Sequence, residues 1–194
     1  DFKHKTKKFL EKILFCYTRK ESKFVLTNNM LEPFSPSSGI SFFEDAVCIV
    51  VQRDPRDIFA SVKNYEHSFV PDFEEKNKIY SKEYLKNLKQ DMLGSENLSS
   101  FITRQKIYND KTILSNESDR IIRIKYEDLV LNYDDTVKKL FSQLGIDSND
   151  HVMKKRFFDP NQSSKNVGIW KTLPDDNDIK KIENELEDLL YDIK

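Results

Sequence analysis

The sequence predicts an α/β protein with a parallel β-sheet flanked by helices. Residues 45–52 (DAVCIVVQ) form an almost continuous apolar run rich in Val and Ile, which is typical of a strand buried on both faces of a parallel sheet. Segments with helical spacing of apolar residues alternate with such strand-like segments along the chain, as in other α/β domains. The length of 194 residues fits one domain, and we expect residues 1–194 to form it.

The first part of the chain begins with a predicted helix over residues 5–17, where apolar side chains recur every three or four positions. Residues 23–27 (KFVLT) favour a short strand, and a loop rich in Asn, Pro and Ser follows. After the strand at 45–52, the helical period returns at Pro55. Residues 68–80 have no clear period and predict a loop or lid.

The second part of the chain adds one predicted strand, 120–126 (RIIRIKY), and a polar loop over 159–176. Gly145 predicts the end of the most regular helix. The predicted helices of this part are 81–93, 99–110, 132–145, 148–158 and 178–193.

The composition argues against several classes of protein. A net charge of −1 disfavours a nucleic-acid binder, and GxxxxGK[ST], the motif of phosphate-loop kinases, does not occur. We expect no metal site, because the three histidines lie far apart and neither CxxC nor HExxH is present. No apolar run approaches the roughly 18 residues of a membrane span. With only two cysteines and no signal-peptide pattern, we expect a cytoplasmic protein.

Arg53 stands where the strand at 45–52 gives way to the next helix. With Pro55 as the first helical residue, Asp54 is the predicted N-cap. Ligands of open α/β sheets bind at the carboxyl ends of strands, a helix N-terminus favours an anion, and an arginine fork suits phosphate or sulfate. Ser61, two turns into the helix, can meet the same anion.

A purely structural interpretation of this charged cluster stays open. Arg–Asp clusters at helix starts often cap the helix and pair with each other. We interpret Asp57 as part of the first helical turn, satisfying the helix dipole and backbone, and Arg56 as a solvated side chain. Arg53 is then either an anion ligand or one more member of the cap.

Three motifs together resemble the sulfotransferases that use 3′-phosphoadenosine 5′-phosphosulfate (PAPS). The first is RDPRD at 53–57 with Ser61 eight residues after Arg53. The second is RIIRIKYEDLVLNYDDTVKKLFSQLGI at 120–146, and the third is SSKNVGIWK at 163–171. Their order matches the family, and the Ser-rich third motif is more similar to bacterial members. The resemblance implies a P-loop-NTPase-like sulfotransferase fold.

The resemblance also implies the residues of a nucleotide site. Arg53 and Ser61 would bind the 3′-phosphate, and Tyr126 would lie against the adenine or hydrogen-bond to it. Glu127 and Asp128 would be structural, and Trp170 would anchor the late loop or simply belong to the core. The loop residues that would close over the nucleotide are Ser163, Ser164 and Lys165.

One family motif does not occur in these 194 residues: the Gly-Thr-rich loop that binds the 5′-phosphosulfate, since no glycine precedes Gly39. We therefore expect the chain to be the C-terminal two-thirds of a longer domain, and leave the catalytic residues unassigned. His67 is a candidate base or a solvated loop residue. The implied function is transfer of a sulfuryl group from PAPS to a hydroxyl or amine of a carbohydrate or small molecule. The alternative is a non-catalytic, sulfotransferase-like nucleotide-binding or scaffold domain.

Overall fold

The chain divides into two compact units in this computed structural model. The first comprises Asp1–Val50 and Asp110–Arg123, and the second comprises Val51–Asn109 and Ile124–Lys194. The boundary falls within both strands of the sheet. That residues 1–194 form one domain stays a prediction.

The structure describes residues 1–19, 21–27, 36–64, 98–113, 119–153, 156, 158–173 and 176–192. Three predictions therefore lie outside the described residues: the loop or lid over 68–80, the helix over 81–93 and the candidate base His67. No helix in the described part of the chain is long and apolar enough to cross a membrane.

The first unit begins with α1 (Phe2–Tyr17), which confirms the first predicted helix with an earlier start. The side chain of Asp1 caps α1 by accepting the N–H of Lys3 at 3.1 Å, because the first N–H groups of a helix lack partners within it. A short helix, α2 (Pro36–Ile40), follows.

The strand predicted over 23–27 is wrong, because these residues have no regular secondary structure. Their apolar side chains are largely exposed, at 62% for Phe24 and 91% for Leu26. A strand needs a neighbouring strand to pair its backbone groups, and the described sheet contains only β1 and β2.

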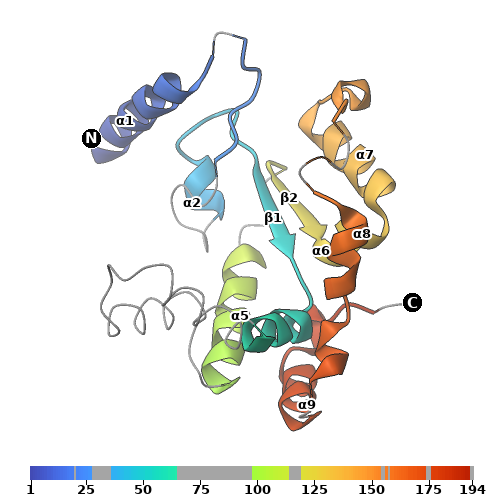
Figure 1. The fold of residues 1–194 in the computed structure, drawn as a ribbon. Coiled ribbons are helices and arrows are strands. Elements are labelled where there is room, and N and C mark those ends of the chain that lie inside the picture. Colours follow the sequence, from blue (N-terminus) through green and yellow to red (C-terminus); the bar gives the residue numbers. More distant parts are fainter. Residues whose placement is uncertain are drawn as a thin grey trace, which may run out of the picture. The chain divides into compact units, whose positions relative to one another are not determined.

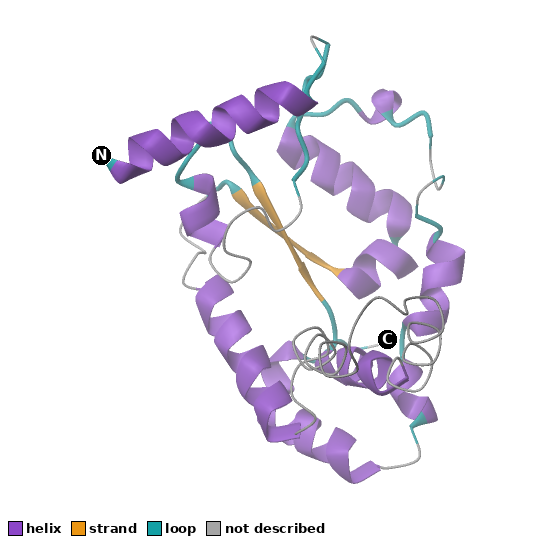
Figure 2. Cartoon of the chain, turned by 60° about the vertical axis from the view of Figure 1, so that its left-hand side comes forward, coloured by secondary structure: helices purple, strands orange, loops and turns teal. Residues whose placement is uncertain are grey.

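The sheet consists of β1 (Cys48–Gln52) paired in parallel with β2 (Ile121–Lys125); Figure 2 shows the two strands in orange. The N–H of Cys48 donates to the carbonyl of Arg120 at 2.8 Å. Both predicted strands are confirmed with shorter bounds, and the α/β class with them. Burial of β1 on both faces is wrong: Val50 is 4% exposed but Val51 is 47% exposed. Successive side chains point to opposite faces, so the face of Val50 is covered more fully than the face that carries Ile49 and Val51.

The second unit is mainly helical. Its first helix begins at Pro55 and is described over 55–64; we call it the 55–64 helix. Helices α6 (Tyr126–Leu131) and α8 (Pro160–Ser163) contact each other, as Figure 1 shows. The other helices that lie wholly or mainly in this unit are α5 (Leu98–Ile113), α6 (Tyr126–Leu131), α7 (Tyr133–Leu144), α8 (Pro160–Ser163) and α9 (Asp176–Glu185).

Helix α7 ends where the sequence predicts. Gly145 adopts a left-handed conformation with φ of 64°, which glycine reaches without the steric cost of a Cβ atom. Its N–H and that of Ile146 donate to the carbonyls of Ser142 and Phe141 at 3.3 and 2.9 Å. These bonds satisfy carbonyls that the end of a helix leaves without partners.

The core of the second unit joins the 55–64 helix, α5 and the C-terminal segment. The rings of Phe59 and Phe101 lie 5.4 Å apart between centroids. Each side chain of this size contributes about 1.5–3 kcal/mol when it leaves water. The buried members are Phe59, Phe101, Ile102, Ile179, Ile182 and Leu186.

Three predictions near the C-terminus need correction. In the described part of the helix predicted over 148–158, the only helical element is a 3₁₀ turn, Ser148–Asp150. The loop predicted over 159–176 contains α8 and the 3₁₀ helices Ser164–Asn166 and Ile169–Thr172. The last helix is shorter than predicted, because α9 ends at Glu185 and a 3₁₀ turn, Glu187–Leu189, follows. Such short turns bury too few side chains to produce a helical period.

Candidate functional site

Arg53 directly follows β1, at the carboxyl end of the strand. Its Nη2 donates to the carbonyl of Asn166 at 2.8 Å, and its guanidinium lies over the ring of Tyr126, with Cζ 4.8 Å from the centroid. Its Nε is buried and has no hydrogen-bond partner in the described part of the chain. A buried donor without a partner is costly, so this guanidinium keeps capacity for another acceptor.

Tyr126 occupies the equivalent place after β2, as the first residue of α6. Its hydroxyl donates to the carbonyl of Ser163 at 3.3 Å. Tyr126 therefore touches both Arg53 and residues 163–170, which we call the late segment. In this way the structure brings three predicted site residues together: Arg53, Tyr126 and Ser163.

Ser164 and Lys165 also lie in the late segment, but their side chains form hydrogen bonds to residues just before them in the chain. The hydroxyl of Ser164 donates to the carbonyl of Asn161 at 2.9 Å. The ammonium of Lys165 donates to Gln162 Oε1 at 3.3 Å and is exposed to solvent. Neither side chain bonds to Arg53 in the described structure.

Ser61 lies on the 55–64 helix and is partly buried. No hydrogen bond joins it to Arg53 among the described residues. Its predicted part in binding the phosphate stays a prediction.

Arg56 is not solvated, contrary to the sequence-based interpretation. Its side chain is 11% exposed and forms ion pairs with Asp54 at 2.6 Å and with Glu183 at 2.8 Å. Burial disfavours the charged guanidinium, but the hydrogen bonds to these two carboxylates outweigh it and raise the pKa of Arg56. Its Cζ also lies 4.6 Å from the ring centroid of Trp170. Glu183 comes from α9, so no local pattern could have predicted the pair.

Asp54 is the N-cap that the sequence predicts. Its Oδ1 accepts the N–H of Arg56 at 2.8 Å, and its carbonyl accepts the N–H of Ile58 at 3.0 Å. Its own N–H donates to Oε1 of Glu127 at 2.8 Å. Asp54, which follows Arg53 in the chain, is thus held by hydrogen bonds to its own helix and to Glu127.

Glu127, for which the resemblance implies a structural role, is only 1% exposed. Its Oε2 is buried without a hydrogen-bond partner in the described residues. Burial raises the pKa of this carboxyl, the N–H of Asp54 opposes the rise, and the negative charges of Asp54 and Asp57 add to it. Its neighbour Asp128 accepts the hydroxyl of Tyr191 at 2.7 Å.

The side chain of Asp57 also bonds to backbone groups outside its own helix. Its carboxylate, in a residue only 1% exposed, accepts the N–H of Gly168 at 2.8 Å and that of Trp170 at 3.2 Å. The Trp170 ring packs against the core of the second unit. Both interpretations of Trp170 thus agree with its contacts: the backbone is anchored and the ring packs on the core.

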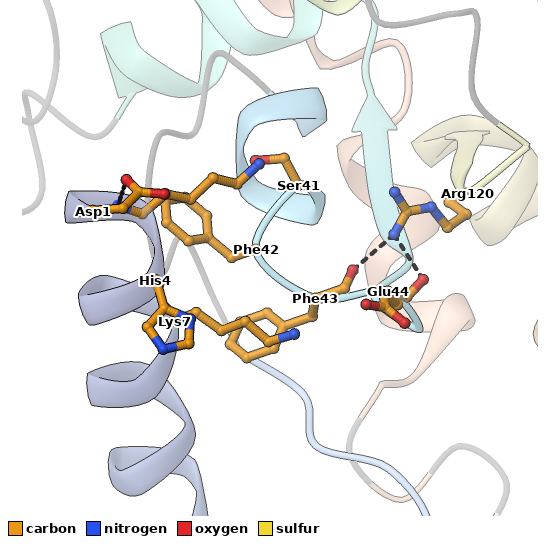
Figure 3. A pocket seen from close by; sticks show the side chains of 9 residues that line it. Asp1, His4, Lys7, Ser41, Phe42, Phe43, Glu44 and Arg120 are labelled. Carbon is orange, nitrogen blue, oxygen red and sulfur yellow. Dashed lines mark hydrogen bonds between the residues drawn. The ribbon is translucent and has the colours of Figure 1, made fainter.

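A cavity of about 290 Å³ lies in the first unit, and none of the predicted site residues lines it (Figure 3). The guanidinium of Arg120 at its wall is turned towards the carbonyls of Phe43 and Glu44, at 2.8 and 2.9 Å. Its lining residues are Asp1, Lys3, His4, Lys7, Ser41, Phe42, Phe43, Glu44 and Arg120.

Comparison with known proteins gives one match. A family model described as a sulfotransferase domain matches residues 1–183. The match includes β1, β2 and the late segment. No curated protein and no solved structure matches the chain significantly.

Proposed function

The chain belongs to the sulfotransferase domain family, and on this premise we propose that it transfers a sulfuryl group from PAPS to an acceptor. The acceptor class we propose is a hydroxyl or amine of a carbohydrate or small molecule. The nucleotide site would be formed by Arg53 together with Ser61, Tyr126 and the late segment.

The observation that carries the proposal is the state of the Arg53 guanidinium. It is placed by β1, stacked on Tyr126 and bonded to a neutral carbonyl, while its Nε lacks a partner among the described residues. Phosphate oxygens are strong acceptors that suit the planar fork of arginine. The guanidinium of Arg53 therefore suits a phosphate group of PAPS.

The rest of the 53–57 segment supports this assignment by elimination. Arg56 is saturated by two carboxylates, so it has little capacity for a ligand. Asp54 is paired with Arg56, and the carboxylate of Asp57 accepts backbone N–H groups. A phosphate beside Arg53 would thus meet a cation that no carboxylate of the described residues already pairs.

The proposed chemistry needs positioning and charge stabilisation from the protein. PAPS supplies the sulfuryl group and the bisphosphate leaving group. Arg53 would hold the 3′-phosphate, and Tyr126 would orient the adenine. Holding a donor and an acceptor in line replaces an encounter in solution by a reaction within one complex.

Binding of 3′-phosphoadenosine 5′-phosphate, measured by calorimetry, tests the site. Each charge-assisted bond to the phosphate is worth about 1.5–3 kcal/mol, so Arg53→Ala should weaken binding about ten- to a hundredfold. The matched control is Arg19→Ala, which removes the same charge from an exposed position in the first unit and should bind like the wild type. Equal affinity of the Arg53 variant and the wild type would contradict the assignment.

Transfer itself needs a second assay, with radiolabelled sulfate on the donor and carbohydrates, lipids and phenols as acceptors. Label on an acceptor supports the enzyme. Nucleotide binding without transfer to any acceptor would instead favour the non-catalytic nucleotide-binding domain.

A further inference from the structure

One buried carboxylate ties the late segment to the helix that follows Arg53. Asp57 accepts two backbone N–H groups, from Gly168 and Trp170, which lie 111 and 113 residues further along the chain. Gly168 has a φ of 75°, a left-handed conformation that glycine adopts without a steric penalty. The two N–H groups that flank Ile169 thereby converge on one carboxylate.

The late segment is held at two further points, both by residues of the proposed nucleotide site. Tyr126 donates to the carbonyl of Ser163, and Arg53 donates to the carbonyl of Asn166. A bound phosphate would compete with the Asn166 carbonyl for the donors of Arg53. Asp57 is different, because its two bonds lie at the far end of the segment and leave Arg53 untouched.

The position of Asp57 in the 55–64 helix places it close to Arg53 in the chain. Asp57 lies four residues after Arg53, within the first turn of the helix whose cap is Asp54. Backbone in this turn is fixed by Glu127 and by the ion pair of Arg56. Hydrogen bonds thus connect the first helical turn, which directly follows Arg53, to Gly168 and Trp170.

We propose that Asp57 is a positioning residue of the nucleotide site, holding residues 163–170 in place beside Arg53. This inference rests on the proposed function. Asp57 itself does not contact the phosphate, because its buried carboxylate is already occupied by the two N–H groups. Its effect reaches the nucleotide through Ser163, Ser164 and Lys165.

The test compares Asp57→Asn with Asp135→Asn, an exposed change of equal charge on α7. An asparagine keeps one acceptor oxygen but turns an amide towards the second N–H. We expect affinity for 3′-phosphoadenosine 5′-phosphate to fall about tenfold in the Asp57 variant and to stay unchanged in the control. Trp170, the only tryptophan of the chain, should become more accessible to acrylamide quenching while the circular dichroism stays native.

A second pair of variants separates positioning from mere stabilisation. Lys165→Ala should weaken binding in the wild-type background and have little effect beside Asp57→Asn, because a released segment no longer presents Lys165 to the nucleotide. Gly168→Ala strains the same contact from the other side and should act in the same direction if the Asp57 variant fails to fold.

The outcomes distinguish the two proposals. A wild type that does not bind the nucleotide overturns the proposed function, and the role of Asp57 with it. A wild type that binds, with folded Asp57→Asn or Gly168→Ala of equal affinity, overturns the positioning role alone. An undiminished effect of Lys165→Ala beside Asp57→Asn also overturns it.

Discussion

Arg53 and Arg56 lie three residues apart and both stack on an aromatic ring, yet their surroundings differ. The guanidinium of Arg56 lies over Trp170 and is bonded to two carboxylates. The guanidinium of Arg53 lies over Tyr126 and is bonded to one carbonyl, with its Nε buried and without a partner in the described chain. The first arrangement stabilises the fold, and the second leaves a donor that a phosphate oxygen would accept under the proposed function.

The difference shows that residue type and local position do not decide what an arginine does. Both side chains belong to the same charged segment, and the carboxylate that completes the surroundings of Arg56 comes from α9, 127 residues away. A cation matched by carboxylates gains nothing from an added phosphate, whereas a cation bonded only to a carbonyl does.

Arg56→Ala should give the largest effect and is the direct way to break the comparison. It leaves Asp54, whose side chain is 4% exposed, as a buried charge without its partner, and such a loss costs about 3 kcal/mol. Arg53→Ala removes one hydrogen bond to a carbonyl and should cost about 1 kcal/mol. Urea unfolding followed by circular dichroism measures both. Equal losses of stability would mean that the two arginines do not have separate roles.

The sequence predicts the features that depend on neighbouring residues. The apolar run before Arg53 and the proline after it place that residue at a strand end and Asp54 at a cap. Gly145 marks the end of α7 for the same local reason. The predicted strand at 23–27 fails because strand formation depends on a partner that no local pattern reveals.

Contacts between distant segments account for what the sequence does not predict. Arg56 is interpreted as solvated because Glu183 and Trp170 are far away in the chain. The bonds that the N–H groups of Gly168 and Trp170 donate to Asp57 are missed for the same reason. The motifs do identify Arg53, Tyr126 and Ser163, which the structure brings together. Their binding of a nucleotide stays a prediction, as do the parts of Ser61, Ser164 and Lys165.

Glu127→Gln tests the comparison more finely. It changes the side chain that accepts the N–H of Asp54, which lies between the two arginines in the sequence. Burial raises the folded-state pKa of Glu127 above its usual value of 4.5. The folded state therefore binds the proton more tightly, and the wild type loses stability as pH rises from about 4.5 through the higher folded pKa. The glutamine variant lacks this loss while its Oε1 can still accept the N–H of Asp54. Measured from pH 5 to pH 8, its stability relative to the wild type should increase with pH.

Urea unfolding of both proteins across this pH range measures the change. Asp128→Asn is the control, since it alters a neighbouring carboxylate that does not bond to Asp54. A stability difference that stays constant with pH would show that Glu127 does not titrate in this window.

Tyr191→Phe should change the stability of the protein least. The backbone carbonyl of Tyr191 accepts from Arg56, so Tyr191 lies next to that side chain. The Tyr191 hydroxyl donates to Asp128 at 2.7 Å, while its backbone N–H donates to Asp54 and its carbonyl accepts from Arg56. The bond to Asp128, with burial and the nearby negative charge, raises the pKa of Tyr191 to about 12. That part of the stability is complete below about pH 10 and lost as pH rises through 12. Phenylalanine keeps both backbone contacts, so the stability at neutral pH should fall by only about 1 kcal/mol.

Phenolate absorbance tests this assignment of Tyr191 directly. At about pH 11, between the usual tyrosine value near 10 and the raised value, Tyr191 should still carry its proton. The Phe variant should therefore have the same phenolate absorbance as the wild type at that pH, although it has one tyrosine fewer. Asp128→Asn removes the acceptor charge and should increase the absorbance, with circular dichroism confirming that each protein is folded. A Phe variant with lower absorbance than the wild type would show that Tyr191 ionises normally, and the contact that joins Asp128 to the surroundings of Arg56 would then be too weak to contribute to them.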